Sequence, residues 1–535
     1  MANLDTLRLQ RRVRALLAPW EGVVPGMTVG VVQDGALVLH ESAGVASLEL
    51  GVPIGPDTCF RIASVSKQFT CTAILLLVAE GRLSLGDEAR THLPELPDFG
   101  VPVTVAHLMH NNSGVRDMLE IMRQGGVDLG MPCTTEDLLA GICRQRTLNF
   151  APGSRFLYSN SNFLLLGLIV ERLTGEPLGR FLDRRVFAPL GMTRTRLTAD
   201  PREPAPGLAT GYLPAVGGFR RAAHGFPLGG EGGLVSCVED LALWDRNFTA
   251  GLVGGPGLAE ALETQVAFPT GVMNRYARGL RVDTWRGVRT VSHGGLWPGY
   301  RTEFLRAPAR GCSVIAITNT GAADPAVLAH RVLDVLLDGA PDVHPVPALP
   351  PRATLTPLAG RWIERDAGMT LDIAVLADGS LAVTTGGATV LPLPAPDGRL
   401  AVTHGTILLA IRMRDDGTLE VEQDAGHVGV WHRVAPGATL PEGLAGVYES
   451  REMASRWTFD GTPEEMRVHV DGPLARGSSW AVEPVEGDLV RLIVPGILAR
   501  AWYDVRVVRD ASGRVTGLRV NTNRLRDVRY ERVTG

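Results

Sequence analysis

The sequence predicts an α+β fold: a mainly antiparallel sheet flanked by helices and carrying an all-α insertion, followed by two small antiparallel β-barrels. Strand-like segments stand near both ends of residues 1–340, with helical patterns between them. Residues 341–357 hold six prolines, a composition typical of a semi-rigid linker. Beyond the linker, short alternating segments are separated by Asp-Gly or Ser-Gly turns. We therefore expect one large domain at 1–340, the linker at 341–357, and barrels at 358–436 and 437–535.

The elements of the first domain follow from local patterns. Leu and Val recur at helical spacing among the arginines of residues 4–17, which predicts an amphipathic helix. Apolar runs on both sides of Asp34-Gly35 predict a hairpin with a tight primed turn. A helix is expected from Ser64 to about Gly81. We further expect mostly helices across 104–200, strands at 288–292, 302–306 and 313–318, and a closing helix at 325–337.

The tail of the chain contains an internal repeat. The segment 358–362 (Leu-Ala-Gly-Arg-Trp) recurs at 444–448 (Leu-Ala-Gly-Val-Tyr), and 431–434 matches 530–533 in the same way. Two copies of one antiparallel unit predict two similar small barrels. We expect these barrels to serve in packing or oligomerisation, because their sequences hold no chemistry of their own.

Composition narrows the function classes. A net charge of −4 gives no reason to expect nucleic acid or an acidic membrane as a partner. No stretch approaches the ~18 apolar residues of a membrane span, and the start lacks the apolar run of a secretory signal, so we expect a cytoplasmic protein. The six cysteines form no Cys-x-x-Cys pair and no zinc-type cluster with histidine, so we expect small buried thiols, no metal and no cofactor.

The chain has a single lysine. Lysine and arginine together number 53, and the only lysine among them is Lys67, three residues after Ser64. Arginine cannot lose its proton near neutral pH, whereas a desolvated lysine can do so and then act as a base for a neighbouring nucleophile. On the first turn of a helix, positions i and i+3 lie on one face, and the helix N-terminus favours a developing alkoxide. The alternative is that an arginine-rich composition left one lysine by chance.

Tyr158 and Asn160 stand at the start of a predicted helix. Tyr158 could share a proton with Lys67 and Ser64, and a neighbouring ammonium would favour its phenolate. The Asn160 amide could hold both Lys67 and a substrate carbonyl. Taken alone, Tyr158 would more often be a core residue.

The third motif is His293-Gly294-Gly295, expected at the end of a strand. The two glycines would let a substrate backbone lie against the strand. The next N–H, from Leu296, could form an oxyanion hole with that of Ser64. Taken alone, His293 would more often be a core or turn histidine bonded to other protein groups.

The order Ser-x-x-Lys, Tyr-x-Asn and His-x-Gly resembles that of the penicillin-recognising serine hydrolases, which include class C β-lactamases, D-Ala-D-Ala carboxypeptidases and related esterases. Residues 64–71, 152–163 and 293–295, together with the two tail domains, are most similar to D-stereospecific aminopeptidases. The resemblance implies a β-lactamase-like first domain and a homodimer as the assembly to test.

The same resemblance implies roles for individual residues. Ser64 would be the nucleophile, Lys67 and Tyr158 would carry protons, and Asn160 and His293 would position the substrate. We expect a serine hydrolase that forms an acyl-enzyme on amide or short peptide substrates, similar to a D-aminopeptidase or amidase. The alternatives are an esterase, a β-lactamase or D,D-carboxypeptidase, and a catalytically dead binding or sensor relative.

Three positions bear on specificity. In the aminopeptidases a loop of the last barrel offers a carboxylate to the free amine of the substrate, whereas the matching stretch here, 494–502, is apolar and has no acid. Arg281 stands where that family has an uncharged amide. Arg301, which the family shares, would either support its strand or meet a substrate carboxylate. The leaving group and the stereochemistry of the substrate stay open.

Overall fold

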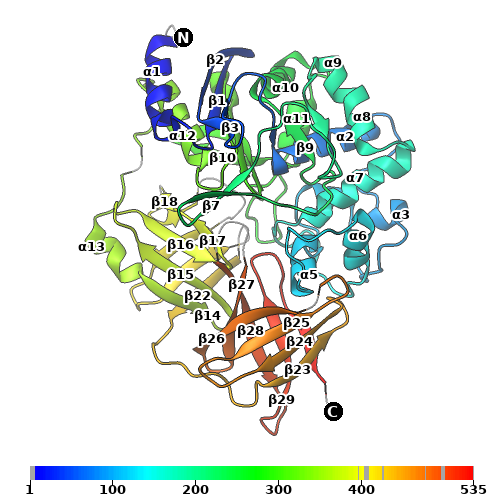
Figure 1. Cartoon of the computed structure of the whole chain (residues 1–535), viewed down its shortest axis with the longest axis vertical. Helices are drawn as coiled ribbons and strands as arrows, with labels where there is room; N and C mark the ends of the chain where they lie inside the picture. The colour runs from blue at the N-terminus through cyan, green and yellow to red at the C-terminus, as the bar shows by residue number, and fades with distance from the viewer. Residues whose placement is uncertain are drawn as a thin grey trace.

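The computed structural model describes residues 6–346, 348–395, 397–402, 409–423, 427–475, 477–495 and 500–533. The chain forms three parts, each built around its own main sheet (Figure 1). The first part carries nearly all the helices and occupies the upper half of Figure 1. The two tail parts, drawn in yellow and in orange to red, lie below it.

A six-stranded antiparallel sheet forms the centre of the first part, in the order β10-β11-β12-β13-β1-β2. The predicted hairpin is present, and its turn residues Asp34 and Gly35 have the positive φ angles (50° and 78°) of a primed turn. The three later strands also form where expected, and β11 continues to Trp297, five residues further than predicted. The strands are β1 Met27–Gln33, β2 Ala36–Ala43, β10 Arg281–Trp285, β11 Val288–Trp297, β12 Tyr300–Ala307 and β13 Cys312–Thr318.

Helices cover both faces of this sheet. Val314 of β13 packs in the core beneath α1 (Thr6–Leu17) and α12 (Pro325–Leu337). The α12 helix matches the prediction, and α1 matches it from residue 6, since residues 4 and 5 lie outside the described residues. Its neighbour Ile315 belongs to the larger core on the opposite face, because successive side chains of a strand point to opposite sides. The other α-helices of five or more residues that the structure describes are α2 Lys67–Ala79, α4 Val105–Met109, α5 Met118–Gln124, α6 Thr135–Cys143, α7 Asn160–Thr174, α8 Leu178–Leu182, α10 Val238–Ala250 and α11 Leu258–Glu263.

The prediction of two antiparallel β domains in the tail is confirmed, the first as a half-barrel and the second as a closed barrel. The barrel closes by pairing β23 with β30. In the described part of the half-barrel, the end strands β17 and β18 do not pair with each other. Its strands are β14 Gly360–Glu364, β15 Met369–Val375, β16 Leu381–Thr385, β17 Ala388–Val390, β18 Leu393–Pro394, β19 Leu400–Ala401, β20 Leu409–Met413, β21 Leu419–Gln423 and β22 His427–Arg433. The barrel strands are β23 Gly446–Ser450, β24 Ser455–Asp460, β25 Arg467–Asp471, β26 Ser478–Glu486, β27 Leu489–Pro495, β28 Arg500–Arg509, β29 Val515–Asn521 and β30 Val528–Arg532.

The sequence repeat corresponds to a repeated structural anchor. Trp362 of the half-barrel donates from Nε1 to the carbonyl four residues earlier at 2.8 Å, and Tyr448 of the barrel donates from its hydroxyl to the equivalent carbonyl at 2.7 Å. Arg433 stacks on Trp362 and Arg532 stacks on Tyr448, with the guanidinium carbons 4.6 and 5.6 Å from the ring centroids. We propose that the tail domains span 358–436 and 437–535, as expected from the sequence, since each of these ranges contains one aromatic residue with its stacked arginine.

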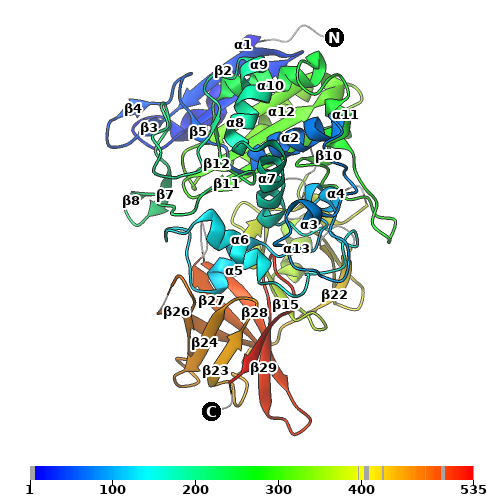
Figure 2. The same ribbon diagram turned by 90° about the vertical axis from the view of Figure 1, so that its right-hand side faces the viewer.

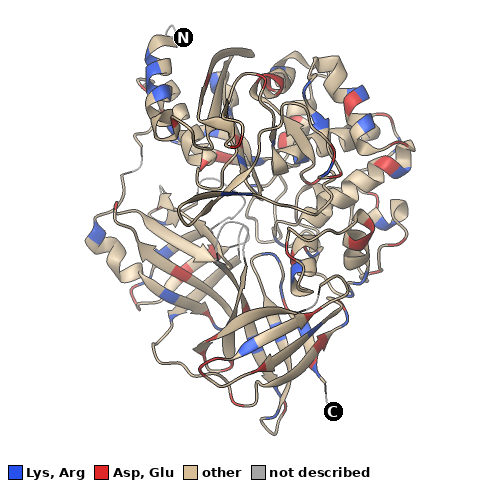
Figure 3. Cartoon of the chain, viewed as in Figure 1, with Lys and Arg blue, Asp and Glu red and all other residues tan. Residues whose placement is uncertain are grey.

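The barrel packs against the helical insertion of the first part (Figure 2). Glu452 Oε2 accepts a hydrogen bond from Arg116 Nη1 at 3.0 Å, and Glu452 Oε1 accepts one from the backbone of Thr147 at 2.9 Å. Arg116 is buried, so this ion pair is shielded from solvent. Acidic and basic residues are mixed over all three parts (Figure 3). No helix in the described ranges is long and apolar enough to cross a bilayer.

Candidate active site

A sharp turn presents Ser64 to a cavity. Strand β5 (Phe60–Arg61) leads into the 3-10 turn η2 (Ala63–Ser66), from which α2 continues. Ala63 has a φ of 47°, a left-handed conformation that is uncommon outside glycine and clusters at functional sites. Within residues 61–70, Ser64 alone is not fully buried. The backbone therefore turns this hydroxyl out of an otherwise buried segment.

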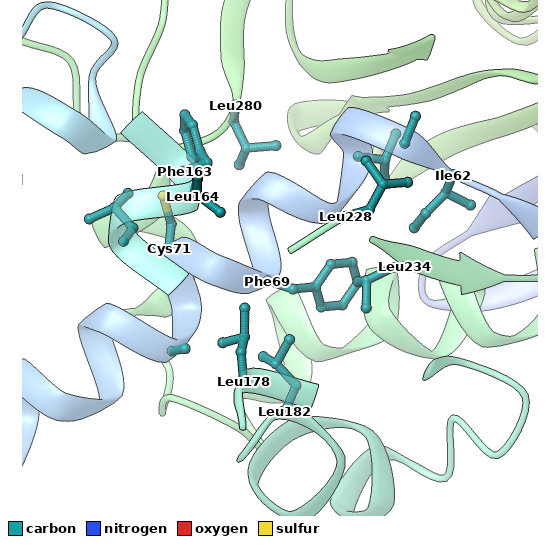
Figure 4. Packing of buried hydrophobic residues seen from close by; sticks show 14 of the residues in the cluster. Ile62, Phe69, Cys71, Phe163, Leu164, Leu178, Leu182, Leu228, Leu234 and Leu280 are labelled. Carbon is teal, nitrogen blue, oxygen red and sulfur yellow. The ribbon is translucent and has the colours of Figure 1, made fainter. Parts of the chain in front are cut away.

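Helix α2 is held by apolar packing on nearly all sides (Figure 4). Phe69 packs on Trp244 and on Phe187, with ring centroids 4.5 and 5.7 Å apart. Gln68 Oε1 accepts a hydrogen bond from Trp244 Nε1 at 2.7 Å. Because dense packing leaves little freedom, the start of the helix is fixed relative to the rest of the first part.

Lys67 is fully buried and touches three oxygens. Its Nζ lies 3.0 Å from Ser64 Oγ, 2.9 Å from Asn160 Oδ1 and 2.5 Å from the backbone oxygen of Glu231. Burial lowers the pKa of Lys67 from 10.5 to about 7, while the nearby Glu231 carboxylate opposes that shift. A neutral amine has two N–H groups and one lone pair. Asn160 and Glu231 offer only acceptors, so the lone pair is left for the Ser64 hydroxyl.

Asp117 fixes the orientation of Asn160. Asp117 Oδ2 accepts hydrogen bonds from the backbone N and from Nδ2 of Asn160, at 2.7 and 3.0 Å. Its other oxygen caps helix α5 by accepting from the backbone of Leu119 and Glu120. Since Nδ2 is engaged by a carboxylate, the Asn160 amide must turn its oxygen toward Lys67.

Tyr158 lies beside Lys67, and its ring centroid is 4.9 Å from Nζ. Burial raises the pKa of Tyr158 above its ordinary value, although an interaction with the Ser64 hydroxyl and the charge of Arg524 both lower it. The sequence-based expectation that a neighbouring ammonium favours the phenolate is therefore wrong. Desolvation of the anion outweighs the neighbouring charge, and Tyr158 is a neutral phenol at neutral pH.

The two glycines of β11 each make room for a close neighbour. A Cβ atom on Gly295 would stand 2.2 Å from the backbone oxygen of Ile62, and one on Gly294 would stand 2.8 Å from Glu303 Oε2. Gly295 therefore lets the strand run directly beside the turn, whereas Gly294 leaves room for the Glu303 side chain of the neighbouring strand β12. Leu296 follows, partly exposed, and lines the cavity with Ser64.

His293 does not line the cavity. It is 2% exposed, its Nδ1 lies 2.7 Å from the Gly294 oxygen, and its Nε2 lies 2.9 Å from the Tyr276 hydroxyl. Burial lowers the pKa of His293 to about 3, so the ring is neutral. Both ring nitrogens are used inside the protein, which leaves none for a substrate. The expected role of His293 in positioning the substrate stays a prediction.

All three parts of the chain line a cavity of about 480 Å³ at Ser64. Tyr158 and Leu296 come from the first part, Gly386 from the half-barrel and Arg524 from the barrel. Within the described ranges, no group of three or more His, Cys, Asp or Glu side chains is arranged to hold a metal ion.

Two arginines singled out in the sequence have structural partners. Arg301 donates to the backbone oxygen of Ala323 at 2.7 Å and to Asp324 at 2.8 Å, which favours the supporting role over a substrate contact. Arg281 is buried and pairs with Asp283 at 2.5 Å. The stretch 494–502 lies partly outside the described residues, and from its described part Ala501 reaches the cavity wall.

Sequence reasoning missed Asp117, Glu231 and Arg524. In the sequence, Asp117 could be recognised only as a helix cap. Glu231 contributes a backbone oxygen, and any residue type could supply that oxygen. Arg524 lies more than 350 residues from Tyr158 in the chain, yet its guanidinium carbon is 5.0 Å from the Tyr158 ring centroid. Nothing local in the sequence marks that contact.

A family model described as Beta-lactamase matches residues 9–337. The chain is 29% identical over 545 residues to a D-aminopeptidase of Brucella anthropi, which covers 100% of both chains. It is 28% identical over 551 residues to a D-aminopeptidase of Cereibacter sphaeroides, covering 99% of this chain and 100% of the relative.

Solved structures share the fold of this chain. The octameric penicillin-binding protein homologue from Pyrococcus abyssi superimposes with a TM-score of 0.57 at 23% identity, over 80% of this chain and 100% of the other. The D-amino acid amidase from Ochrobactrum anthropi SV3, complexed with L-phenylalanine amide, superimposes with a TM-score of 0.52 at 26% identity, over 61% and 98%. Since the family model spans well over half of its length, the chain belongs to the Beta-lactamase family.

Proposed function

We propose that this protein is a serine hydrolase that forms an acyl-enzyme on amide or short peptide substrates. The observation that carries the proposal is the buried Lys67 amine, which lies 3.0 Å from Ser64 Oγ and has a pKa of about 7. Such an amine is neutral often enough to accept the serine proton. The curated relatives are named D-aminopeptidases, which supports an amide substrate over an ester.

In the first step, Ser64 Oγ bonds to the carbonyl carbon while its proton moves to Lys67. The carbonyl oxygen becomes an oxyanion, which the N–H groups of Ser64 and Leu296 would stabilise. The bond to the leaving amine then breaks, and the amine takes the hydroxyl proton of Tyr158. The proton held on Lys67 replaces it.

In the second step, a water molecule attacks the acyl ester and gives a proton to Lys67. The ester bond breaks, Ser64 Oγ recovers that proton, and the carboxylic acid leaves. Asn160 serves both steps, because Asp117 holds its amide oxygen on Lys67. We assign His293 a positioning role through Tyr276 and Gly294, since it reaches no cavity wall.

The proposal is tested in two stages. A fluorophosphonate probe should label the protein, and the label should be lost in Ser64→Ala. A panel of D- and L-amino acid amides, N-blocked amides, short peptides, p-nitrophenyl esters and β-lactams then identifies the substrate. Absence of labelling together with absence of turnover would favour the dead binding relative. Turnover of esters alone would favour the esterase, and turnover of β-lactams would favour the β-lactamase.

Location and assembly stay predictions. We keep the cytoplasm as the expected location and the homodimer as the expected assembly, and neither nucleic acid nor a membrane is an expected partner. One structural relative is an octameric penicillin-binding protein homologue, so a larger assembly is the competing outcome. Light scattering of the purified protein distinguishes the two assemblies.

A further inference from the structure

Two buried cysteines face each other across a strand pair that leads into the active-site turn. Strand β5 pairs antiparallel with β9 (Leu234–Ser236), and Phe60 lies opposite Ser236. The backbone of the next residue, Cys237, is still extended, with a φ of −131° and a ψ of 172°. Continuing the register by one residue therefore puts Cys59 opposite Cys237.

The backbone hydrogen bonds show what kind of pair this is. Cys59 donates its N–H to the Gly207 oxygen at 2.8 Å and accepts the Ala209 N–H at 2.9 Å, so both of its backbone groups point away from β9. Opposite residues without mutual hydrogen bonds have Cα atoms about 4.5 Å apart, and their side chains are close together. A disulfide needs a Cα separation of roughly 4.4–6.8 Å. The two backbones therefore already have the separation of a disulfide.

The two thiols are hydrogen-bonded to each other, and this bond makes them unequal. It is the main cause that lowers the pKa of Cys59, and the charge of Arg196 adds a smaller effect, while burial opposes both. The same bond, together with burial, raises the pKa of Cys237. All six cysteines lie in the described residues, and burial raises the pKa of the other four. Cys59 is therefore the thiol that most readily becomes a thiolate, the nucleophilic form.

A thin layer of the chain covers the Cys59 sulfur. The side chain is 1% exposed, but a Cβ atom added to Gly207 would lie only 3.6 Å from its Sγ. Gly207 and Asp57, which lie next to this sulfur, are both exposed. The sulfur is therefore one residue below the surface. A small displacement of the loop at 204–207 would admit a molecule as small as hydrogen peroxide.

We propose that Cys59 and Cys237 form a reversible disulfide when the protein meets a hydroperoxide, which makes this strand pair a redox modification site. With hydrogen peroxide, the Cys59 thiolate attacks one oxygen, the O–O bond breaks, and Cys59 becomes a sulfenic acid. The departing hydroxide takes up the proton that Cys59 released and becomes water. Cys237 then attacks the sulfenic sulfur, the S–S bond forms, and the S–O bond breaks to release a second water. The two sulfurs lose two electrons to the peroxide, and a dithiol reverses the bond by exchange.

The bond would join two segments that hold the active site. Strand β5 leads into the turn of Ser64, and β9 follows Glu231, whose backbone oxygen accepts a hydrogen bond from Lys67 Nζ at 2.5 Å. A link between residues 59 and 237 closes a long loop of the chain, and long loops give the larger stabilisation. Thiol reductants keep cysteines reduced in the cytoplasm, the location that the sequence predicts. The bond would then form under oxidative stress and stabilise the site.

The test uses the full chain, with hydrogen peroxide as the probe. After treatment, free thiols are alkylated in denaturant and the peptides are identified by mass spectrometry. We expect one linked pair of peptides, holding Cys59 and Cys237, and a Tm about 4 °C or more above that of the untreated protein. Dithiothreitol should reverse both changes. Cys59→Ser and Cys237→Ser should each prevent both changes, whereas Cys133→Ser, which removes a half-buried thiol outside the pair, is the matched control and should keep them.

Several outcomes would refute the disulfide. Peroxide could leave both thiols unmodified, oxidise them separately, or link one of them to a different cysteine. A link that leaves Tm unchanged or lowers it would also refute the proposal, because the bond would then not fit the native geometry. Treatment in urea is the control for geometry: mixed pairings are expected there, and the same single pair would mean that the folded register does not select it. None of these measurements requires turnover, so their outcome is independent of the proposed function.

Discussion

Replacing Lys67 by arginine separates its charge from its ability to lose a proton. Both side chains are cations, but only the lysine titrates near neutral pH. With a pKa of about 7, roughly half of Lys67 is neutral at pH 7, whereas a solvated lysine would be neutral in only about one molecule in 3,000. Burial therefore enlarges the population of the base by about 10³-fold. A guanidine, with a pKa above about 12, is neutral in fewer than about one molecule in 10⁵.

Lys67→Arg should accordingly lower kcat/KM at pH 7 by about 10³-fold or more, even though it keeps the positive charge. The assay is the initial rate on the best substrate of the panel, measured from pH 5.5 to 9. The wild-type rate should rise through a midpoint near pH 7 as Lys67 loses its proton. Ser64→Ala supplies the background rate.

Two results would refute this reasoning. One is a Lys67→Arg rate within tenfold of the wild type, which would remove Lys67 as the base. The other is a wild-type profile that is flat between pH 5.5 and 8.5, which would mean that no group with a pKa near 7 controls acylation.

Three further predictions concern buried residues. Lys67→Met should gain free energy of unfolding relative to the wild type as the pH falls from 10.5 to 7, because the folded wild type resists protonation of Lys67 and the unfolded chain does not. Denaturant titrations that give the same difference at every pH would contradict this prediction. Gly295→Ala should abolish phosphonate labelling, because the added Cβ would meet the Ile62 oxygen at 2.2 Å and displace the Ser64 turn, and unchanged labelling would disprove that close approach. Glu452→Gln should lower the free energy of unfolding by about 3 kcal/mol, because the buried charge of Arg116 loses its counter-ion. The expected readout is faster proteolysis at the barrel contact, and proteolysis at the wild-type rate would show that the ion pair contributes little.

The parts of the site that sequence could reveal are local. Ser64 and Lys67 are three residues apart on one helical turn, so their contact follows from helix geometry once the helix is expected. The hairpin at Asp34-Gly35 and the helix at 325–337 were likewise predictable, because residues close together in the sequence determine the turn type and the spacing of apolar side chains.

The parts that sequence could not reveal depend on distant segments or on burial. The acceptors that orient Lys67 include a backbone oxygen of Glu231 and an amide held by Asp117, and neither leaves a pattern in the residues near Ser64. The raised pKa of Tyr158 results from burial, which was unknown before the fold was known. Arg524 reaches the cavity only because the barrel docks against the first part.

The pKa of the buried amine can be measured directly, because the chain has one lysine. Protein produced with lysine labelled at ¹³Cε gives a single side-chain resonance, whose chemical shift can be followed from pH 5 to 11. The account predicts a midpoint near pH 7 for this resonance. A midpoint near 10.5, the value of a solvated lysine, would contradict the claim that Lys67 serves as the base for Ser64.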